Sequence, residues 1–167
     1  MILTIRPEHP EDIPAIREVI KVAFKAVPHS ENNEHLIVDA LRDDDALTIT
    51  RVAEEEDKIV GYIAVSPVTL SNGESGWYGI GPLAVSPTAQ SRGLGSKLMQ
   101  SALLWLRENA KGCVLLGEPE FYSQFGFKVT DGLILHGAPP EYFMALSFNH
   151  HYPRADITYH PSFYPSS

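Results

Sequence analysis

Hydrophobic and polar positions change their period several times along this chain, and these changes predict short strands and helices in alternation. Residues 2–6 alternate as in a strand, and the prolines that follow end it. From 14 to 24 apolar residues recur every three or four positions, which predicts a helix with Pro14 in its first turn. Ser30 is a favourable N-cap, so a second helix is expected over 31–41.

The middle of the chain favours strands. Residues 46–53 and 58–70 predict two strands around an acidic turn, and the dipeptide Asn72-Gly73 is a hairpin signal that leads into a third strand ending at Val85.

A long helix is predicted over residues 97–107, followed by further strands. The apolar side of this helix is expected to hold Leu94, Leu98, Leu104 and Trp105. Strands are then expected at 113–117, 129–130 and 144–148, with a loop rich in Gly and Pro over 131–140. The mixture of helices and strands predicts an α/β fold, and no repeat or linker divides residues 1–167.

Composition fits one compact domain. With 167 residues and 44% hydrophobic content, the chain is long enough to bury a full core without disulfides, and it has only one cysteine, Cys113. A net charge of -8 argues against a nucleic-acid binder, because phosphate contacts need clustered Lys and Arg. No leader or membrane segment stands out, so a cytoplasmic protein is expected.

The most informative motif lies between the third strand and the long helix. It consists of Gln90, Ser91, Arg92, Gly93, Leu94 and Gly95. Backbone N–H groups in the first turn of a helix have no internal partner, and the helix dipole is positive there. A glycine-rich loop at this point therefore suits a polyphosphate or pyrophosphate.

Spacing excludes two common phosphate loops. A Walker loop needs Gly-Lys-Ser/Thr at its end, but Gly95 is followed by Ser96 and only then by Lys97. A dinucleotide fingerprint needs a small third residue, but Leu98 stands there. What remains is Gln-x-x-Gly-x-Gly, for which the alternative is a tight turn whose glycines only supply positive φ.

A second motif follows the strand at 113–117. In the segment 118–127, Tyr122 stands four residues before the pair Gly126-Phe127. The two motifs, in this order, resemble those of the GNAT superfamily of acyl-CoA-dependent N-acetyltransferases. The sequence of the second motif is similar to that of the YhbS-like bacterial branch of the superfamily. The resemblance covers roughly residues 1–130.

The resemblance implies an α/β fold with a mixed, splayed central sheet flanked by helices, and acetyl-CoA as co-substrate. In this family the pantetheine arm of acetyl-CoA pairs with the edge of a strand, and the pyrophosphate of acetyl-CoA lies on the glycine loop. Carried over to this chain, the acetyl-CoA-binding residues are Leu83, Ala84 and Val85 for the pantetheine, and Gln90, Ser91, Arg92, Gly93, Leu94, Gly95 and Ser96 for the pyrophosphate.

Tyr122 matches the family's position for a general acid, which protonates the departing thiolate. Its alternative is a packing role among the neighbouring phenylalanines. An amine with a pKa near that of lysine, about 10.4, is protonated at neutral pH, so a base must also remove a proton. Direct attack within a ternary complex is expected, since Cys113 is more easily explained as a buried strand residue than as a nucleophile.

Glu118 is the first choice for this base, because it stands at the strand end that faces the splay. Its alternative is a catalytically idle carboxylate at a helix N-terminus. Glu31, Glu34 and His35 are rival candidates, since their segment lines the acceptor side in the family. Each of these three is also explained as part of a solvated helix face.

The acceptor and the role of residues 131–167 stay open. A small amine, an amino sugar, an amino-acid derivative or a protein amine would each fit. The aromatic tail would pack on the body, cover the acceptor site or join a homodimer. The histidines and acidic runs predict no metal site, because their spacing does not converge. Competing functions are a noncatalytic acyl-CoA-binding or sensing module and a nucleotide-binding protein.

Overall fold

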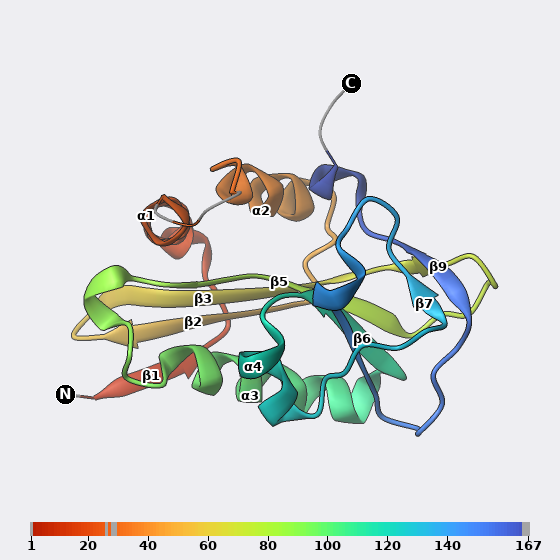
Figure 1. The fold of residues 1–167 in the computed structure, drawn as a ribbon. Coiled ribbons are helices and arrows are strands. Elements are labelled where there is room, and N and C mark those ends of the chain that lie inside the picture. Colours follow the sequence, from red (N-terminus) through yellow and green to blue (C-terminus); the bar gives the residue numbers. More distant parts are fainter. Residues whose placement is uncertain (1, 26, 28–29, 165–167) are drawn as a thin grey trace.

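The computed structural model describes residues 2–25, 27 and 30–164. They fold around a six-stranded sheet in the order β1-β2-β3-β5-β6-β8, with helices on both faces (Figure 1). The strands are β1 (Leu3–Arg6), β2 (Ile49–Glu55), β3 (Lys58–Pro67), β5 (Trp77–Val85), β6 (Gly112–Leu116) and β8 (Phe143–Ser147). Neighbouring strands are antiparallel except for β5 and β6, which run parallel.

Helices cover the two faces of the sheet. Helices α1 (Ile13–Phe24) and α2 (Glu34–Asp43) lie on one side, and α3 (Leu94–Asn109) lies on the other together with the short α4 (Pro119–Tyr122) (Figure 1). Short 3₁₀ turns occur at Pro10–Asp12, Pro87–Ala89, Ser123–Phe125, Pro140–Tyr142 and Pro161–Phe163. Across the described residues, no helix is long and apolar enough to cross a membrane.

Strand β3 is buried on both faces and joins the two layers of the core. Tyr62 and Ala64 pack beneath α1 and α2, whereas Ile63 and Val65 pack against α3. This division follows from the two-residue period of a strand. Each large apolar side chain buried in this way stabilises the fold by about 1.5–3 kcal/mol.

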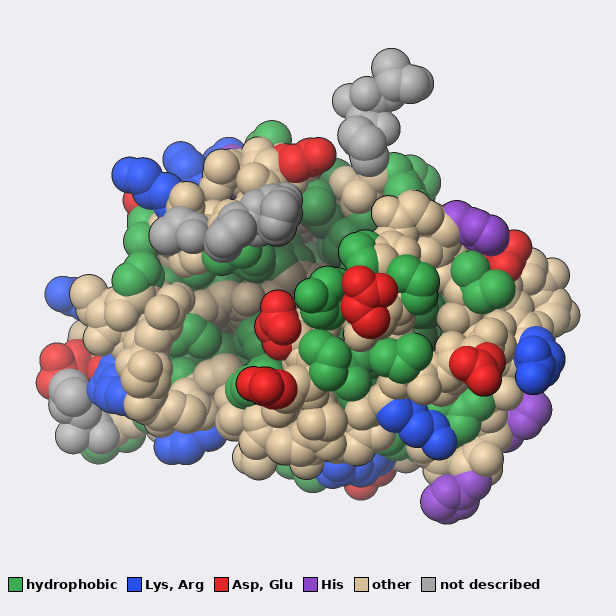
Figure 2. All heavy atoms as spheres, in the orientation of Figure 1, with side chains coloured by type: hydrophobic (Ala, Val, Ile, Leu, Met, Phe, Trp, Pro, Cys, Tyr) green, Lys and Arg blue, Asp and Glu red, His purple; other side chains and the backbone are tan. Residues whose placement is uncertain are grey.

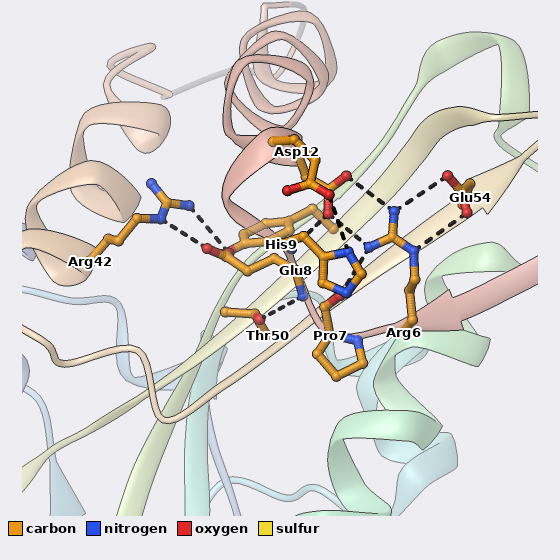
Figure 3. A network of polar contacts seen from close by, with 10 residues as sticks. Arg6, Pro7, Glu8, His9, Asp12, Arg42, Thr50 and Glu54 are labelled. Atoms are coloured by element: carbon orange, nitrogen blue, oxygen red, sulfur yellow. Dashed lines mark hydrogen bonds and ion pairs between the residues drawn. The ribbon is translucent and has the colours of Figure 1, made fainter.

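A polar network ties α2 to the sheet (Figure 3). Glu8, which follows β1, accepts hydrogen bonds from both Nε and Nη2 of Arg42 at 2.9 and 3.2 Å, and from the hydroxyl of Tyr62 at 2.8 Å. Burial, and then the nearby Glu8 carboxylate, raise the pKa of Tyr62, so its hydroxyl stays a donor. Because Arg42 stands in the last turn of α2, the network anchors the C-terminal end of that helix to the segment that follows β1.

A second, three-stranded sheet lies beside the main one, in the order β4-β9-β7. Its strands are β4 (Thr69–Leu70), β9 (Ala155–Thr158) and β7 (Leu133–Ile134). After β9 the chain turns back, and the 3₁₀ turn at Pro161–Phe163 packs against α2 (Figure 1). The C-terminal segment therefore crosses one end of the helical layer.

Two of the strand expectations in the C-terminal third were wrong. Residues 129–130 form no strand, because only Lys128 bridges Ala145 there. A strand forms instead at Leu133–Ile134, within the predicted loop, where it pairs with β9. The Lys128 bridge and the two-residue strand Leu133–Ile134 are both short pairings that depend on tertiary contacts. The local pattern of apolar and polar residues does not encode such contacts.

Two helix details also differ from the prediction. Helix α2 begins at Glu34 with Asn33 as its N-cap, and the hydroxyl of Ser30 donates to the Glu34 carboxylate instead of capping the helix. In α3, Leu104 is 67% exposed, and the buried face is Leu94, Leu98, Met99, Ala102, Leu103 and Leu106. Those residues follow i, i+3 and i+4 spacing along one stripe, from which Leu104 is displaced.

Candidate active site

Strands β5 and β6 diverge in the middle of the main sheet. Their parallel ladder covers only Trp77–Gly79 against Gly112–Val114. Beyond it, β6 continues along β8, whereas Ile80–Val85 of β5 stay paired with β3 alone. β5 carries one extra residue opposite Ala64, a bulge that turns the strand at this point. One edge of β5 is therefore open.

Alternation along β5 decides which backbone groups meet this open edge. The amide of Ser86 donates to Val60 of β3 at 2.8 Å, so Ala84, two residues earlier, also directs its backbone groups toward β3. Leu83 and Val85 direct theirs to the open side. The carbonyl of Val85 accepts a hydrogen bond from Nε2 of Gln90 at 3.1 Å.

The glycine loop leads directly into the N-terminus of α3. Ser91 and Gly93 both adopt left-handed backbone conformations, with φ of 68° and 77°, and Gly93 is the N-cap. The first intrahelical bond runs from Lys97 N to Gly93 O at 3.1 Å. The amides of Leu94, Gly95 and Ser96 precede it, so they have no partner within the helix.

A small hollow of about 200 Å³ lies at this loop. Val85 and Phe121 form its other walls. A Cβ on Gly95 would stand 3.7 Å from Cζ of Phe121 and 3.9 Å from Cγ2 of Val85, in ordinary van der Waals contact with both. Any larger side chain at Gly95 would thus extend into the space between the loop and these two residues.

Arg92 is held by a partner from the far end of β2. Its Nη2 and Nη1 atoms donate to Oε1 and Oε2 of Glu55 at 2.9 and 3.1 Å. This two-point contact fixes the guanidinium beside the loop. The exposed fraction of its side chain is 39%, so solvent and anions reach it.

Tyr122 lies at the start of the open edge, on the last turn of α4. Its ring packs edge-on against Phe121 and Phe127, with centroid distances of 4.8 and 6.3 Å. Burial raises the pKa of Tyr122 above its usual value near 10, so the phenol stays protonated at neutral pH. The aromatic packing expected for this residue is present together with its position at the open edge.

Tyr122 also lines a cavity of about 350 Å³ between the open edge of β5 and the start of α2. Leu83 and Leu116 come from the two diverging strands, while Glu34 comes from α2. Figure 2 shows a hollow between the helical layer and α4, lined mainly by hydrophobic side chains. The divergence of the strands, the tyrosine and one carboxylate thus meet in one space.

The four residues considered for the base lie in different surroundings. Glu118 is exposed and is the N-cap of α4, where its carbonyl accepts from the amides of Phe121 and Tyr122. It does not line the cavity, whereas Glu34 does. Glu31 lines a separate outer groove. His35 is half-buried, and its Nδ1 has no hydrogen-bond partner among the residues that the structure describes.

Cys113 is buried in β6, as predicted. Burial raises the pKa of its thiol, which keeps it protonated and unreactive. Over residues 2–25, 27 and 30–164, no group of three or more His, Cys, Asp or Glu side chains could hold a metal ion. His160 packs against α2, where its Nε2 lies 2.8 Å from Oδ2 of Asp44.

Comparison with known proteins agrees with these features. Residues 46–129, half of the chain, match the family model described as acetyltransferase (GNAT) domain. The chain belongs to the GNAT acetyltransferase family. The predicted family and its acetyltransferase class are confirmed, and the splayed mixed sheet between helices agrees with the predicted GNAT fold.

Relatives within the GNAT family match over most of the chain. The uncharacterized N-acetyltransferase YhbS of Escherichia coli is 35% identical over 130 residues, 77% of this chain and 75% of that protein. A GNAT acetyltransferase from Brucella melitensis, solved with acetyl-CoA, has a TM-score of 0.87 and 43% identity over 97% of this chain and 98% of its own. The YhbS structure with CoA has a TM-score of 0.85, 30% identity and coverage of 96% and 91%.

Two residues at this GNAT site were missed by the sequence reasoning. Glu55 was treated as part of a solvated acidic turn, although it pairs with Arg92 across 37 positions. Tyr159 was noted only as part of an aromatic tail, although it lines the same cavity as Tyr122. Nothing in the sequence around Glu55 indicates that it pairs with Arg92. The cluster of aromatic residues near the C-terminus is a weak signal that Tyr159 belongs to the site.

Proposed function

We propose that this protein transfers the acetyl group of acetyl-CoA to a primary amine, by direct attack within a complex of both substrates. The observation that carries the proposal is the single cavity that joins the open edge of β5, the phenol of Tyr122 and the carboxylate of Glu34. The relative from Brucella melitensis, solved with acetyl-CoA, supports the same co-substrate here.

The residues at the open edge fit the chemistry of acetyl-CoA. The backbone groups of Leu83 and Val85 would pair with the amides of the pantetheine arm. The amides of the glycine loop and the N-terminus of α3 would hold the pyrophosphate. The amide of Gln90 would leave the Val85 carbonyl when the arm binds. Ala84, expected to take part, would not contact the arm, because its backbone groups face β3 and its side chain is buried in the core beneath α1 and α2.

Proton transfer follows from the two polar side chains of the cavity. Glu34 would accept a proton from the ammonium of the acceptor, which generates the neutral amine. The amine nitrogen then forms a bond to the thioester carbonyl carbon, and the C–S bond breaks. Tyr122 would donate its proton to the departing sulfur, and it regains one from the nitrogen of the product.

Glu34 is our choice of base over Glu118. Glu34 lines the cavity, and the hydroxyl of Ser30 orients its carboxylate through a 2.7 Å hydrogen bond to Oε2. Glu118 is exposed at the N-terminus of α4, which supports the structural role that was its alternative. A carboxylate inside the cavity also weakens the case for a noncatalytic acyl-CoA-binding module.

Calorimetric titration with acetyl-CoA, CoA and ATP tests the binding half of this proposal. Gly93→Glu should abolish acetyl-CoA binding, because it adds a negative charge where the pyrophosphate would lie. Gly73→Glu is a matched control: Gly73 also has a positive φ, of 83°, and open space around the position of a Cβ, but it lies in a distant turn. Binding that survives Gly93→Glu would contradict the proposed loop.

Release of CoA on addition of an amine tests the catalytic half. An acetyltransferase releases CoA only when an acceptor is present, whereas a sensing module binds acetyl-CoA and releases none. Binding of ATP in preference to acetyl-CoA would favour the nucleotide-binding alternative.

A further inference from the structure

The cavity beside Tyr122 is lined by apolar residues and an acidic one. Glu34 is the one charged side chain among its described lining residues, and the others are Gly, Pro, aliphatic or aromatic residues. From this composition we propose that the acceptor is a small primary amine with an apolar body, such as an alkylamine or arylalkylamine. Its ammonium pairs with Glu34, and Tyr159 and Phe163 enclose its body. This inference rests on the proposed function.

Charge selects the ammonium end of the acceptor. A single carboxylate in an apolar cavity attracts a cation, and the short bond from Ser30 holds it in one orientation. A carboxylate on the acceptor itself, in addition to that of Glu34, would meet no positive side chain among the described lining residues. Free amino acids are therefore disfavoured, because an unpaired buried charge is costly.

The apolar walls select the body of the acceptor. Each hydroxyl of an amino sugar would lose its hydrogen bonds to water and find few partners here, and each hydroxyl left without a partner weakens binding. The aromatic rings of Tyr159 and Phe163 offer instead an apolar surface, with a centroid distance of 5.2 Å. Polyhydroxylated and polycationic acceptors are disfavoured for the same reason.

Tyr159 forms the end wall of the cavity. Its ring lies on the backbone of Gly79, where β5 and β6 part: a Cβ on Gly79 would be 2.5 Å from Cε1 of Tyr159. The amide of Tyr159 donates to the hydroxyl of Tyr164 at 3.0 Å. Burial raises the pKa of Tyr159, so this wall carries no charge at neutral pH.

The segment that carries this wall is attached to α2. Nε2 of His160 lies 2.8 Å from Oδ2 of Asp44, and its Nδ1 accepts from the amide of Ser162. On the outer side, Tyr159 also borders a larger groove of about 940 Å³ between α2 and the C-terminal segment. Tyr159 thus separates the inner cavity from this groove, together with Ile37, which lines both.

Size sets the last limit. The inner cavity measures about 350 Å³ and must also receive the acetyl end of the co-substrate. If each non-hydrogen atom takes up to the ~30 Å³ that a water molecule occupies in the liquid, the space holds about twelve such atoms, of which the acetyl group takes about three. An acceptor of the size of hexylamine or 2-phenylethylamine fits, whereas a folded polypeptide would need the groove outside the wall.

A panel of acceptors tests the substrate class by CoA release. Hexylamine and 2-phenylethylamine should exceed glucosamine, lysine, spermidine and a peptide with a free N-terminus by about tenfold or more in kcat/KM, since 1.4 kcal/mol corresponds to a factor of ten. Turnover that is equal or higher with the polar amines or the peptide would overturn the inference and leave the acetyltransferase function standing.

Variants and a binding measurement separate the inference from the function. With CoA present, calorimetry should detect binding of 2-phenylethylamine that Glu34→Gln weakens about tenfold while CoA binding is retained. Glu31→Gln is the matched control, because Glu31 has the same charge and borders only the outer groove. Tyr159→Ala should join the cavity to the groove and raise kcat/KM for amines longer than hexylamine relative to hexylamine itself.

Each outcome has one meaning. Binding of 2-phenylethylamine that depends on Glu34, without CoA release, would uphold the inferred pocket and contradict the proposed reaction. Turnover that responds neither to Glu34→Gln nor to the acceptor's polarity would contradict the pocket and uphold the reaction. The absence of both binding and turnover in a protein that still binds acetyl-CoA would overturn both.

Discussion

The ring of Tyr122 lies directly on the backbone of Gly117. A Cβ built on Gly117 would stand 2.6 Å from Cδ2 and 3.1 Å from Cζ of that ring, closer than side chains approach one another. The absence of a side chain at Gly117, the residue after β6, therefore leaves room for the tyrosine ring. Any side chain at this position must displace the ring from the open edge of β5.

Gly117→Ala should lower kcat by about tenfold or more while the Kd of acetyl-CoA changes little, because Tyr122 is moved and the glycine loop is untouched. Overpacking of this kind also costs about 1–3 kcal/mol of stability. The measurement is steady-state CoA release beside calorimetry. In a Gly117→Ala, Tyr122→Phe double variant the two losses should not add, and additive losses would contradict the link.

Tyr122→Phe should reduce kcat by about a hundredfold, in the range of general acid catalysis, and leave acetyl-CoA binding intact. Tyr142→Phe is the control, because Tyr142, directly before β8, is 39% exposed and does not line the cavity. Unchanged turnover in Tyr122→Phe would end the general-acid assignment.

The pH profile gives a second test of the same residue. Burial raises the pKa of Tyr122, so the phenol loses its proton only above its usual value near 10. The rate should therefore show no alkaline decline from this group between pH 7 and 10. The measurement is kcat against pH for the wild type and for Tyr122→Phe. A decline in kcat of the wild type between pH 7 and 10 would indicate that the acid is another group.

Much of the fold was predictable because its elements are locally consistent. The 3.6-residue period of α1 and the alternation of β1 to β3 follow from burial on one side or on both. The position of the glycine loop was predictable because the glycines stand between a strand pattern and a helix pattern, and Gly93 is indeed the N-cap of α3. Strands β7 and β9 were not, since each owes its position to partners elsewhere in the chain.

The residues of the candidate site were easier to bring together from sequence at the glycine loop, where acetyl-CoA is proposed to bind, than at the proposed acceptor side. The two motifs lie within a continuous stretch, so spacing alone relates Gly95 to Tyr122. The acceptor side brings Glu34 together with Tyr159 across 125 positions, and only tertiary packing of the C-terminal segment on α2 does this. Glu118 had the better sequence position for a base, but its place at the N-terminus of α4 leaves it exposed.

Glu55→Gln should tighten acetyl-CoA binding by a few fold at low salt. Glu55 now holds Arg92 by two hydrogen bonds, and removal of its charge frees the guanidinium for the phosphates. Glu56→Gln removes the same charge from an exposed neighbour that does not contact Arg92, so it controls for net charge. Equal effects of the two substitutions would mean that only the overall field changes.

Asp12 links stability to pH through Arg6. The hydrogen bonds from Arg6, at 2.7 and 3.1 Å, hold the pKa of the buried Asp12 carboxyl below its ordinary value. In the unfolded chain that pKa is about 3.9, so the unfolded state binds the proton first as pH falls. The contribution is therefore complete well above pH 4 and is lost as pH falls through the lower, folded pKa.

Asp12→Asn should accordingly destabilise the protein by about 1.5–3 kcal/mol at pH 7, the range for hydrogen bonds to charged groups. The difference from wild type should shrink as pH falls below about 4, because the unfolded wild-type chain then binds a proton at this carboxyl before the folded protein does. Denaturant unfolding at pH 7, 5, 4 and 3 measures it, with Asp131→Asn as the control because Asp131 is exposed. A difference in unfolding free energy between wild type and Asp12→Asn that stays constant down to pH 3 would contradict this link. It would mean that packing, and not the charge of Asp12, holds the turn before α1 against β1.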